Sequence, residues 1–360
     1  MVDFISRTYL IERLIGIGCY VLVVMFTYNG ILKYGSVHLK KNLKICTIFL
    51  VILAFFFLPD EHKDLSRILQ MTNGWKNMSL SEFYNSHIID SATSMGYFYY
   101  YLCRKIPYDG ALPAITAFIF YFNVFHIVKL MFNEKANKAD AIAVSFLFFM
   151  AAGCFLEVIS DIRNFLAFSI VVRCFCDEWI NKKNLVFNIP LYVISALMHS
   201  AVIPLLAIRF IYFIIFENDL TLAKKSFIMF FMLGGIFVFA SKFGYSLTRA
   251  FEKTVGFINN ESYSYLWEYI IGIIQWFVVF TITRRIRKCS EYGSFDNGIK
   301  HINRMAMLIL ILEILMIFEY NIFHRFMLVS LLLSIPQISY YYSAQKDKKQ
   351  LSSLKTEPPQ

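Results

Sequence analysis

Charged residues are scarce in this chain. Aspartate, glutamate, lysine and arginine make up 17% of its 360 residues, while hydrophobic residues make up 58%. A soluble globular domain carries about 25% charged residues, so the composition excludes that class and indicates an integral membrane protein. The length of such a chain gives a number of membrane spans rather than a number of soluble domains.

Several motifs that would define a chemistry are missing. The sequence contains no Walker A motif, which excludes an ATPase core, and no HExxH, paired CxxC or G-x-S-x-G pattern. No Asp-x-Asp pair stands at an expected outer helix end, which weighs against a metal-dependent phosphosugar transferase. The 7 cysteines have no framework spacing, so we interpret them as small apolar residues. The sequence therefore predicts no metal and no other cofactor.

The net charge of +10 does not indicate nucleic-acid binding, because the lysines and arginines lie in loops between apolar segments. Hydropathy predicts an all-α polytopic membrane protein with roughly eleven transmembrane helices. The predicted spans are 14–32, 43–58, 112–132, 139–159, 164–180, 185–199, 200–216, 226–245, 264–283, 305–318 and 322–342. Pro190, His199 and Pro204 interrupt the run 185–216, which fits two short helices that meet near the outer face or one kinked helix.

Loop charges set the predicted orientation. With the N-terminus outside, the inner loops and tail hold 20 of the 35 lysines and arginines, and the outer segments hold 12. This distribution follows the positive-inside rule. We expect one integral membrane domain over 1–344 with an outer loop at about 59–111, and a disordered cytoplasmic tail over 345–360. The outer loop contains an aromatic patch, MGYFYYYLC at 95–103, which fits the membrane interface, a sugar-binding surface or an ordinary solvated loop.

Arg163 lies at the junction of two apolar segments, in the sequence SDIRNFLAFSIVV. An arginine at the centre of a membrane helix costs ~2.5–3.5 kcal/mol, and less near the interface, so its charge needs compensation. Glu157 and Asp161 are four residues apart and share a face of a continuous helix. The three residues fit a salt bridge that pins two helix ends. They also fit an anion site in which the planar guanidinium binds a phosphate group.

Two further positions attract attention. His199 lies in an apolar run, followed by Ser200 and Pro204, so it is either a core histidine or part of a broken helix that lines a cavity. His324 and Arg325 open the last span at the level predicted for Arg163.

This second basic cluster suggests one anionic pocket shared with Arg163, and the alternative is snorkelling of Arg325 to the interface. Glu313 lies mid-span in LILILEILMIF and is expected to face the protein interior, where it fits a pairing with Arg163 or Arg325.

The stretch EVISDIRNFLAFSIVV, the basic loop WINKKN and FNIPLYVISALMHSAVIPLL together resemble the EpsG-like branch of bacterial polysaccharide polymerases. The similarity covers about residues 150–210. Asp64 occupies the place of an acidic residue that this family has early in its first large outer loop, although Ile68 stands where an aromatic residue is usual. The residues that match the two motifs are Ile162, Arg163, Asn164, Ala167, Met198, His199, Ser200 and Ala201.

The resemblance implies a Wzy-type repeat-unit polymerase with a GT-C-like helical bundle, located in the bacterial inner membrane with its active site facing the periplasm. Such an enzyme transfers glycan from undecaprenyl pyrophosphate to the next repeat unit, without a metal, and builds O-antigen, capsule or exopolysaccharide. Its implied partners are the lipid-linked oligosaccharide, the bilayer and a chain-length regulator protein. The implied pyrophosphate-binding residues are Arg163, Arg325 and His324, and the catalytic candidates are Asp161, His199 and Asp64.

Other classes remain open at this stage. A flippase for lipid-linked sugars needs the same outer cations, but it also needs a cationic path through the membrane, and the sequence shows no paired halves. A membrane acyltransferase combines His and Arg, but its donor site normally lies toward the inner face. An O-antigen ligase, or another lipid-linked glycosyltransferase, is the nearest enzymatic rival. A ligase typically has its large outer loop late in the chain, whereas this loop precedes residue 112.

Overall fold

The computed structural model describes residues 2–57, 64–89, 91, 93–133, 139–153, 155–217, 266–290, 296–317 and 320–356. Every regular element in these ranges is a helix. Four helical segments within them are long and apolar enough to cross a membrane: Leu14–Gly35, Ala111–Met131, Tyr269–Arg287 and Ile322–Lys346. They confirm a helical membrane protein and coincide with four of the predicted spans, whereas the total of eleven stays a prediction. The predicted span 226–245 lies outside the described residues.

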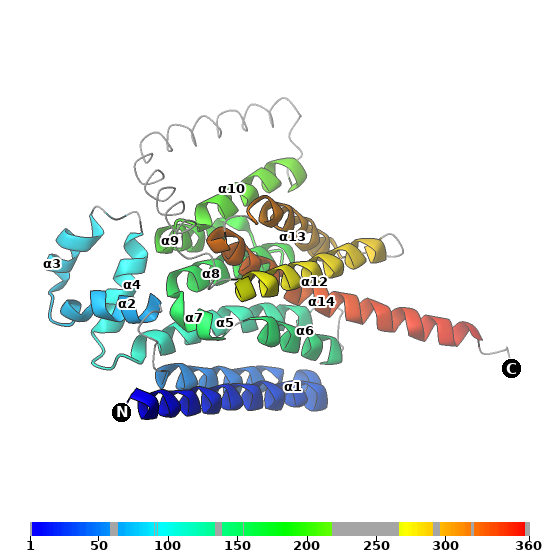
Figure 1. Cartoon of the computed structure of the whole chain (residues 1–360). Helices are drawn as coiled ribbons and strands as arrows, with labels where there is room; N and C mark the ends of the chain where they lie inside the picture. Colours follow the sequence, from blue (N-terminus) through cyan, green and yellow to red (C-terminus); the bar gives the residue numbers. More distant parts are fainter. Residues whose placement is uncertain are drawn as a thin grey trace.

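The first element, α1 (Val2–Phe55), is a helical hairpin. The chain reverses at Gly35, where φ is 53° and ψ is −133°, a conformation that glycine adopts without the clash of a side chain. Figure 1 shows the two arms of α1 side by side, against α5 and α6. This hairpin agrees with the two predicted spans 14–32 and 43–58.

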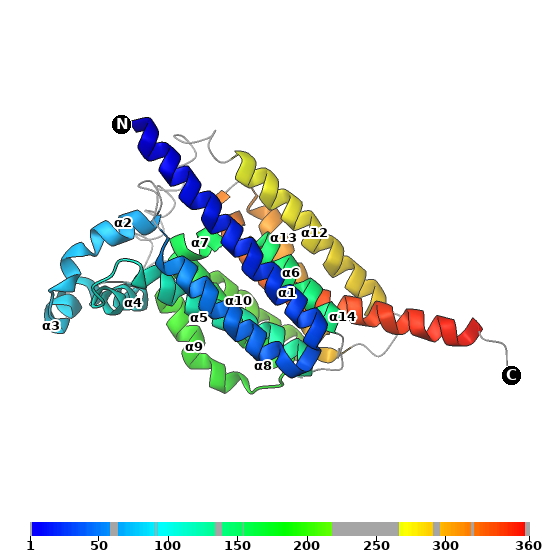
Figure 2. The same cartoon turned by 90° about the horizontal axis from the view of Figure 1, so that it is seen from below.

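The predicted outer loop folds into short helices at one end of the bundle: α2 (Asp64–Met71), η1 (Asn73–Lys76), α3 (Leu80–Phe83), the π-helical turn η2 (Tyr84–Ile88) and α4 (Ser94–Arg104). Figures 1 and 2 both show α2, α3 and α4 grouped at this end, which we call the α4 end, while the last helix extends beyond the opposite end. The aromatic patch predicted at 95–103 forms most of α4.

Ion pairs hold these short helices together. The buried Arg104 donates to Asp109 at 2.5 Å, and Lys105 donates to the Met78 carbonyl at 2.6 Å. The Arg104 guanidinium, with help from Lys76, lowers the pKa of the Asp109 carboxyl, so this pair persists at neutral pH. The segment is therefore a packed cap on the α4 end, in place of the ordinary solvated loop that its composition also allowed.

The next helices are α5 (Ala111–Asn133), α6 (Ala139–Ala152), α7 (Phe155–Ser160) and α8 (Ile162–Trp179). The sequence predicted one continuous span over 139–159, but α6 ends at Ala152 and Gly153 follows it. The Ala152 carbonyl, which the break leaves without a helical partner, accepts a hydrogen bond from Gln275 at 2.8 Å. The break makes α7 a separate short helix, which turns into α8 immediately before Arg163.

The apolar run 185–216 is two short helices rather than one kinked helix. After η3 (Leu185–Asn188), α9 (Ile189–Met198) ends at His199, which is extended with φ −152° and ψ 126°. The chain then enters α10 (Val202–Tyr212) and the π-helical turn η4 (Phe213–Glu217). Pro190 and Pro204 each lie in the first turn of their helix, where a missing N–H breaks no helical hydrogen bond.

The last three helices are α12 (Leu266–Ser290), α13 (Asn297–Leu315) and α14 (Tyr320–Thr356). Most of the apolar part of α14 is buried among its neighbours, so α14 and α8 form the centre of the bundle. The tail that the sequence predicted as disordered, 345–360, continues α14 as far as Thr356. It contains no proline or glycine before that point, and extending an existing helix costs little. Lys346 in this extension pairs with Asp140 of α6.

A buried ionic cluster joins α8 to α10 at the end of α8 farther from Arg163. Arg209, with a side chain 5% exposed, lies 2.7 Å from Glu178 and 3.0 Å from Glu217. Glu178 also accepts hydrogen bonds from Tyr192 and Asn188 of the adjoining helix. Arg209 is thus paired with two carboxylates inside the protein.

Replacing Arg209 with methionine should destabilise the protein by about 3–5 kcal/mol, because Glu178 and Glu217 lose the cation that neutralises them. The measurement is the thermal unfolding temperature of the purified protein in lipid nanodiscs. Lys183→Met is the matched control. Its 3.8 Å contact with Asp177 is 45% exposed on the lysine side, and loss of such a pair costs below about 1 kcal/mol. Equal Tm values for the two variants would contradict the prediction.

Candidate functional site

Three helix ends meet at the α4 end of the bundle. Arg163 stands at the start of α8, His199 follows the end of α9, and Arg325 lies in the first turns of α14. The charges of Arg325 and Arg163 both act on the His199 ring, and α8 packs against both α9 and α14. We call Arg163, His199 and Arg325 the arginine site.

Arg163 makes no ion pair with the described residues, although two carboxylates are near it in sequence. His324 contacts Glu157 at 3.1 Å, and Asn164 donates to Asp161. Within the described ranges, no carboxylate oxygen comes within 4.0 Å of the Arg163 guanidinium. The salt bridge considered from the sequence, between Arg163 and Glu157 or Asp161, is therefore absent from the structure.

The surroundings of Arg163 are largely aromatic. Its guanidinium lies 5.8 Å from the Tyr97 ring centroid and 5.9 Å from that of Tyr100, which are distances typical of cation–π contacts. A long hydrogen bond of 3.4 Å reaches Thr93. These contacts restrict the position of the guanidinium group. They supply no negative charge to balance it among the described residues.

Arg325 is half-buried and likewise has no ion pair among the residues that the structure describes. The pairing of Glu313 with Arg163 or Arg325, suggested from the sequence, is wrong. Glu313 is fully buried and accepts a hydrogen bond from Ser330 of α14 at 2.6 Å instead. His324, which precedes Arg325 and was predicted to bind pyrophosphate, contacts Glu157. This contact joins α14 to α7 at the edge of the site.

His199 has a defined hydrogen bond at the break between α9 and α10. Its Nδ1 accepts from the backbone N–H of Ala201 at 3.0 Å. In the neutral ring this bond places the proton on Nε2, which makes Nε2 a donor. For His199, a catalytic candidate from the sequence, this geometry favours a role as a hydrogen-bond donor over a role as a general base.

The two aspartates named as catalytic candidates differ in position. Asp161 precedes Arg163 at the α7–α8 turn, and its charge acts on the Tyr100 phenol. Asp64 opens α2 and pairs with Arg67 on its own helix. In the described part of the chain, no hydrogen bond or ion pair joins Asp64 to Arg163, His199 or Arg325. The structure thus places Asp161, but not Asp64, beside Arg163.

The contribution of α4 to the site was not predicted from the sequence. Thr93, Gly96, Tyr97 and Tyr100 lie at helical spacing on one face, and that face meets Arg163. A Cβ added at Gly96 would lie 2.8 Å from both Arg163 Cδ and the Met198 carbonyl oxygen. The glycine therefore allows α4 to approach the end of α9 closely. Its helical spacing from Thr93 and Tyr100 was visible in the sequence, but nothing there indicated which helix this face would meet.

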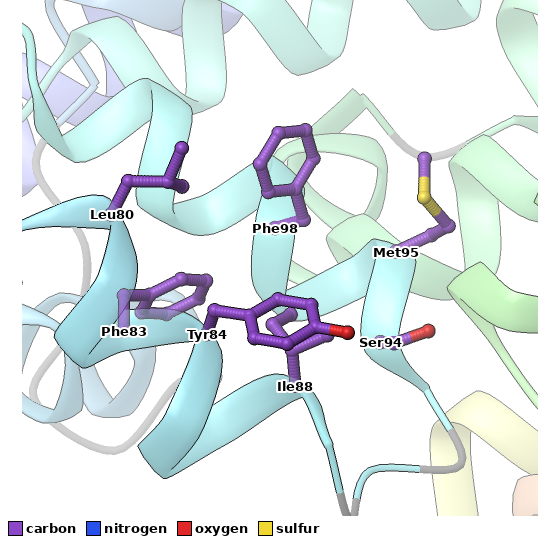
Figure 3. A pocket seen from close by; sticks show the side chains of 7 residues that line it. All are labelled: Leu80, Phe83, Tyr84, Ile88, Ser94, Met95 and Phe98. Atoms are coloured by element: carbon purple, nitrogen blue, oxygen red, sulfur yellow. The ribbon is translucent and has the colours of Figure 1, made fainter.

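A small cavity lies beside α4 (Figure 3). Its volume is about 180 Å³, and its lining is almost entirely apolar: Leu80, Phe83, Tyr84, Ile88, Ser94, Met95 and Phe98. Dry apolar cavities of ~150 Å³ hold molecules such as benzene. No charged side chain lines this cavity, so it does not suit an anion or a sugar.

The described residues contain no group of three or more His, Cys, Asp or Glu side chains placed to hold a metal ion. Comparisons with protein-family models, with curated proteins and with solved structures gave no match for this chain. The resemblance to EpsG-like polymerases therefore rests on the motifs of residues 150–210 and stays a prediction.

Gly96→Ala should lower the unfolding free energy by about 1–3 kcal/mol, because the new methyl group overlaps the Met198 carbonyl and the Arg163 side chain. Gly74→Ala in η1 is the matched control, since a Cβ there meets nothing within 4 Å. Thermal unfolding of both variants checks the prediction. A Gly96→Ala variant as stable as the Gly74→Ala variant would refute the close packing of α4.

Proposed function

We propose that this protein polymerises oligosaccharide repeat units carried on a polyprenyl diphosphate, and that Arg163 and Arg325 bind the diphosphate. The observation that carries the proposal is the arginine site itself. Two half-buried guanidinium groups converge from distant parts of the chain, and neither pairs with a carboxylate among the described residues. A bound anion supplies the missing counter-charge.

The chemistry of guanidinium favours a phosphate ligand. Its planar fork donates two parallel hydrogen bonds to phosphate oxygens, and its weak hydration lowers the cost of burying the pair. Tyr97 and Tyr100 orient the Arg163 plane, so less conformational entropy is lost when the ligand binds. Two arginines match the charge of a diphosphate better than that of a single carboxylate.

The proposed reaction is a glycosyl transfer. A hydroxyl oxygen of the acceptor repeat unit forms a bond to the anomeric carbon of the donor, the bond from that carbon to the diphosphate oxygen breaks, and the hydroxyl proton passes to a base. Negative charge builds on the departing diphosphate, and fixed guanidinium groups aimed at it stabilise the transition state more than the bound donor.

Asp161 is the base that fits best among the three candidates. It lies next to Arg163 in the chain and beside Tyr100 in space, whereas Asp64 stands apart and His199 presents a donor. The Nε2–H of His199 then donates to a diphosphate oxygen. In this assignment Asp161 accepts the hydroxyl proton, His199 donates to the diphosphate, and the two arginines balance the charge of the diphosphate.

The membrane location supports a lipid-linked donor. The arginine site lies at an end of an apolar helical bundle, where α4 of the cap formed by α2 to α4 meets Arg163. A lipid-linked sugar presents its diphosphate at this depth, with hydrocarbon below and glycan above. The lysine and arginine distribution of the sequence supports an orientation with this end outside, which for the proposed enzyme is the periplasmic face of the inner membrane.

Replacing Arg163 with alanine should abolish polymer and leave single repeat units on the cell surface, with normal protein levels, because the diphosphate loses its main cation. The measurement is the ladder of surface glycan lengths. Arg67→Ala is the control, since Arg67 is exposed and pairs only with Asp64 among the described residues.

The pattern of surface glycan separates the proposal from its rivals. Single repeat units at the surface indicate that flipping and ligation continue, whereas loss of all repeat units from the surface would indicate a flippase or a ligase. A long ladder in the Arg163→Ala strain would rule out the role assigned to Arg163.

A further inference from the structure

The three consecutive tyrosines of α4 differ in what their hydroxyl groups contact. The Tyr99 hydroxyl lies 2.8 Å from Thr116 Oγ1, and the Tyr101 hydroxyl donates to the Met78 carbonyl at 3.0 Å. The Tyr100 hydroxyl makes no hydrogen bond of normal geometry with the described residues, although the Arg163 guanidinium lies close enough to interact with its oxygen. The middle tyrosine of the run is therefore the exception.

Tyr100 is also the most buried of the three, with 1% of its surface exposed. A hydroxyl group shielded from water without a partner destabilises the fold, and proteins leave few buried polar groups in this state. When one occurs, a ligand that is absent from the structure is one of the explanations that physical chemistry offers. A phenylalanine would fill the same space without that cost, so the hydroxyl needs an explanation beyond packing.

The position of Tyr100 identifies the ligand. The Arg163 guanidinium lies 5.9 Å from its ring, and the charges of Arg163 and Asp161 both act on the phenol. The close packing of Gly96 on α9 fixes α4, and with it Tyr100, against this site. The phenol oxygen lies close to the Arg163 guanidinium, so an anion bound by Arg163 lies near the hydroxyl hydrogen, which has no acceptor among the described residues.

We propose that the Tyr100 hydroxyl donates a hydrogen bond to the diphosphate that Arg163 holds, an assignment that rests on the function proposed above. Burial raises the pKa of Tyr100 by more than the positive charge of Arg163 lowers it, so the phenol keeps its proton and acts as a donor. The attraction between an arginine and the diphosphate depends mainly on distance, whereas a hydrogen bond from the neutral phenol also fixes the orientation of the diphosphate oxygen. Its hydrogen bond strengthens as negative charge builds on the departing oxygen.

Tyr100→Phe tests the assignment, because it removes one oxygen atom and keeps the ring that faces Arg163. The probe is inorganic pyrophosphate, titrated against the full chain in lipid nanodiscs. We expect the affinity to fall roughly ten- to a hundredfold, the usual loss for a hydrogen bond to a charged group. The Tm of the ligand-free variant should not fall, since no hydrogen bond among the described residues is removed.

Tyr101→Phe is the matched control. It removes the hydroxyl of the next residue, whose partner, the Met78 carbonyl, still accepts a hydrogen bond from Lys105 at 2.6 Å. Its pyrophosphate affinity should equal that of the wild type. Arg163→Ala, measured in parallel, reports on the proposed function independently of Tyr100.

The outcomes separate the two claims. If Arg163→Ala weakens binding and Tyr100→Phe does not, the role of Tyr100 is refuted while the diphosphate site stands. If neither variant changes binding, both the diphosphate site and the role of Tyr100 are refuted. A lower ligand-free Tm for Tyr100→Phe would show that the hydroxyl serves the fold, which also overturns the assignment.

Discussion

The site depends on two positive charges, Arg163 and Arg325, that lie at one end of an apolar bundle and have no ion-pair partner among the described residues. Elsewhere in the described residues, the two buried arginines pair with carboxylates. Arg209 lies between two glutamates, and Arg104 contacts Asp109. Arg163 and Arg325 have no ion pair among the described residues. The nearby carboxylates have other partners, since Glu157 contacts His324 and Asp161 accepts a hydrogen bond from Asn164. This contrast within one molecule is the basis for proposing that the two arginines bind an anionic ligand.

The fold keeps those acidic groups away from the arginines by breaking its helices. The break after Ala152 lets α7 turn, so that Glu157 faces His324 of α14 rather than continuing a helical face toward Arg163. The second break, at His199, ends α9 beside the start of α8. Both breaks expose backbone groups in a membrane protein, and side chains or new helix starts satisfy them. The geometry of the site thus follows from where helices stop.

Local sequence was sufficient for part of this arrangement. Alternation of apolar spans put Arg163, His199 and Arg325 at one membrane level, and the structure brings these three helix ends together. The partners of the charges were not predictable. Whether Glu157 meets Arg163 or His324 depends on a helix break at Gly153, and on how α7 and α14 pack.

The role of α4 was hidden for a related reason. The run MGYFYYYLC has the composition of a membrane-interface patch, and its composition does not distinguish a tyrosine facing lipid from one facing an arginine. The distinction depends on Gly96, whose missing side chain lets α4 approach α9. A single small residue therefore decides the position of the whole helix, and its effect is visible only when the neighbouring helix is known.

The two ends of α8 bear on whether the arginines bind a ligand in place or pass it through the membrane. At the far end of α8, Asp177 contacts His126 and Glu178 binds Arg209, so the described charges there are mutually compensated. Between Arg163 and Arg173, α8 carries no charged residue, and most of this stretch is buried. An anion held at Arg163 therefore finds no second cation along α8 for several turns. This arrangement suits a site where the anion stays at one face while chemistry occurs on the sugar attached to it, and it fits poorly with a relay of cations across the membrane.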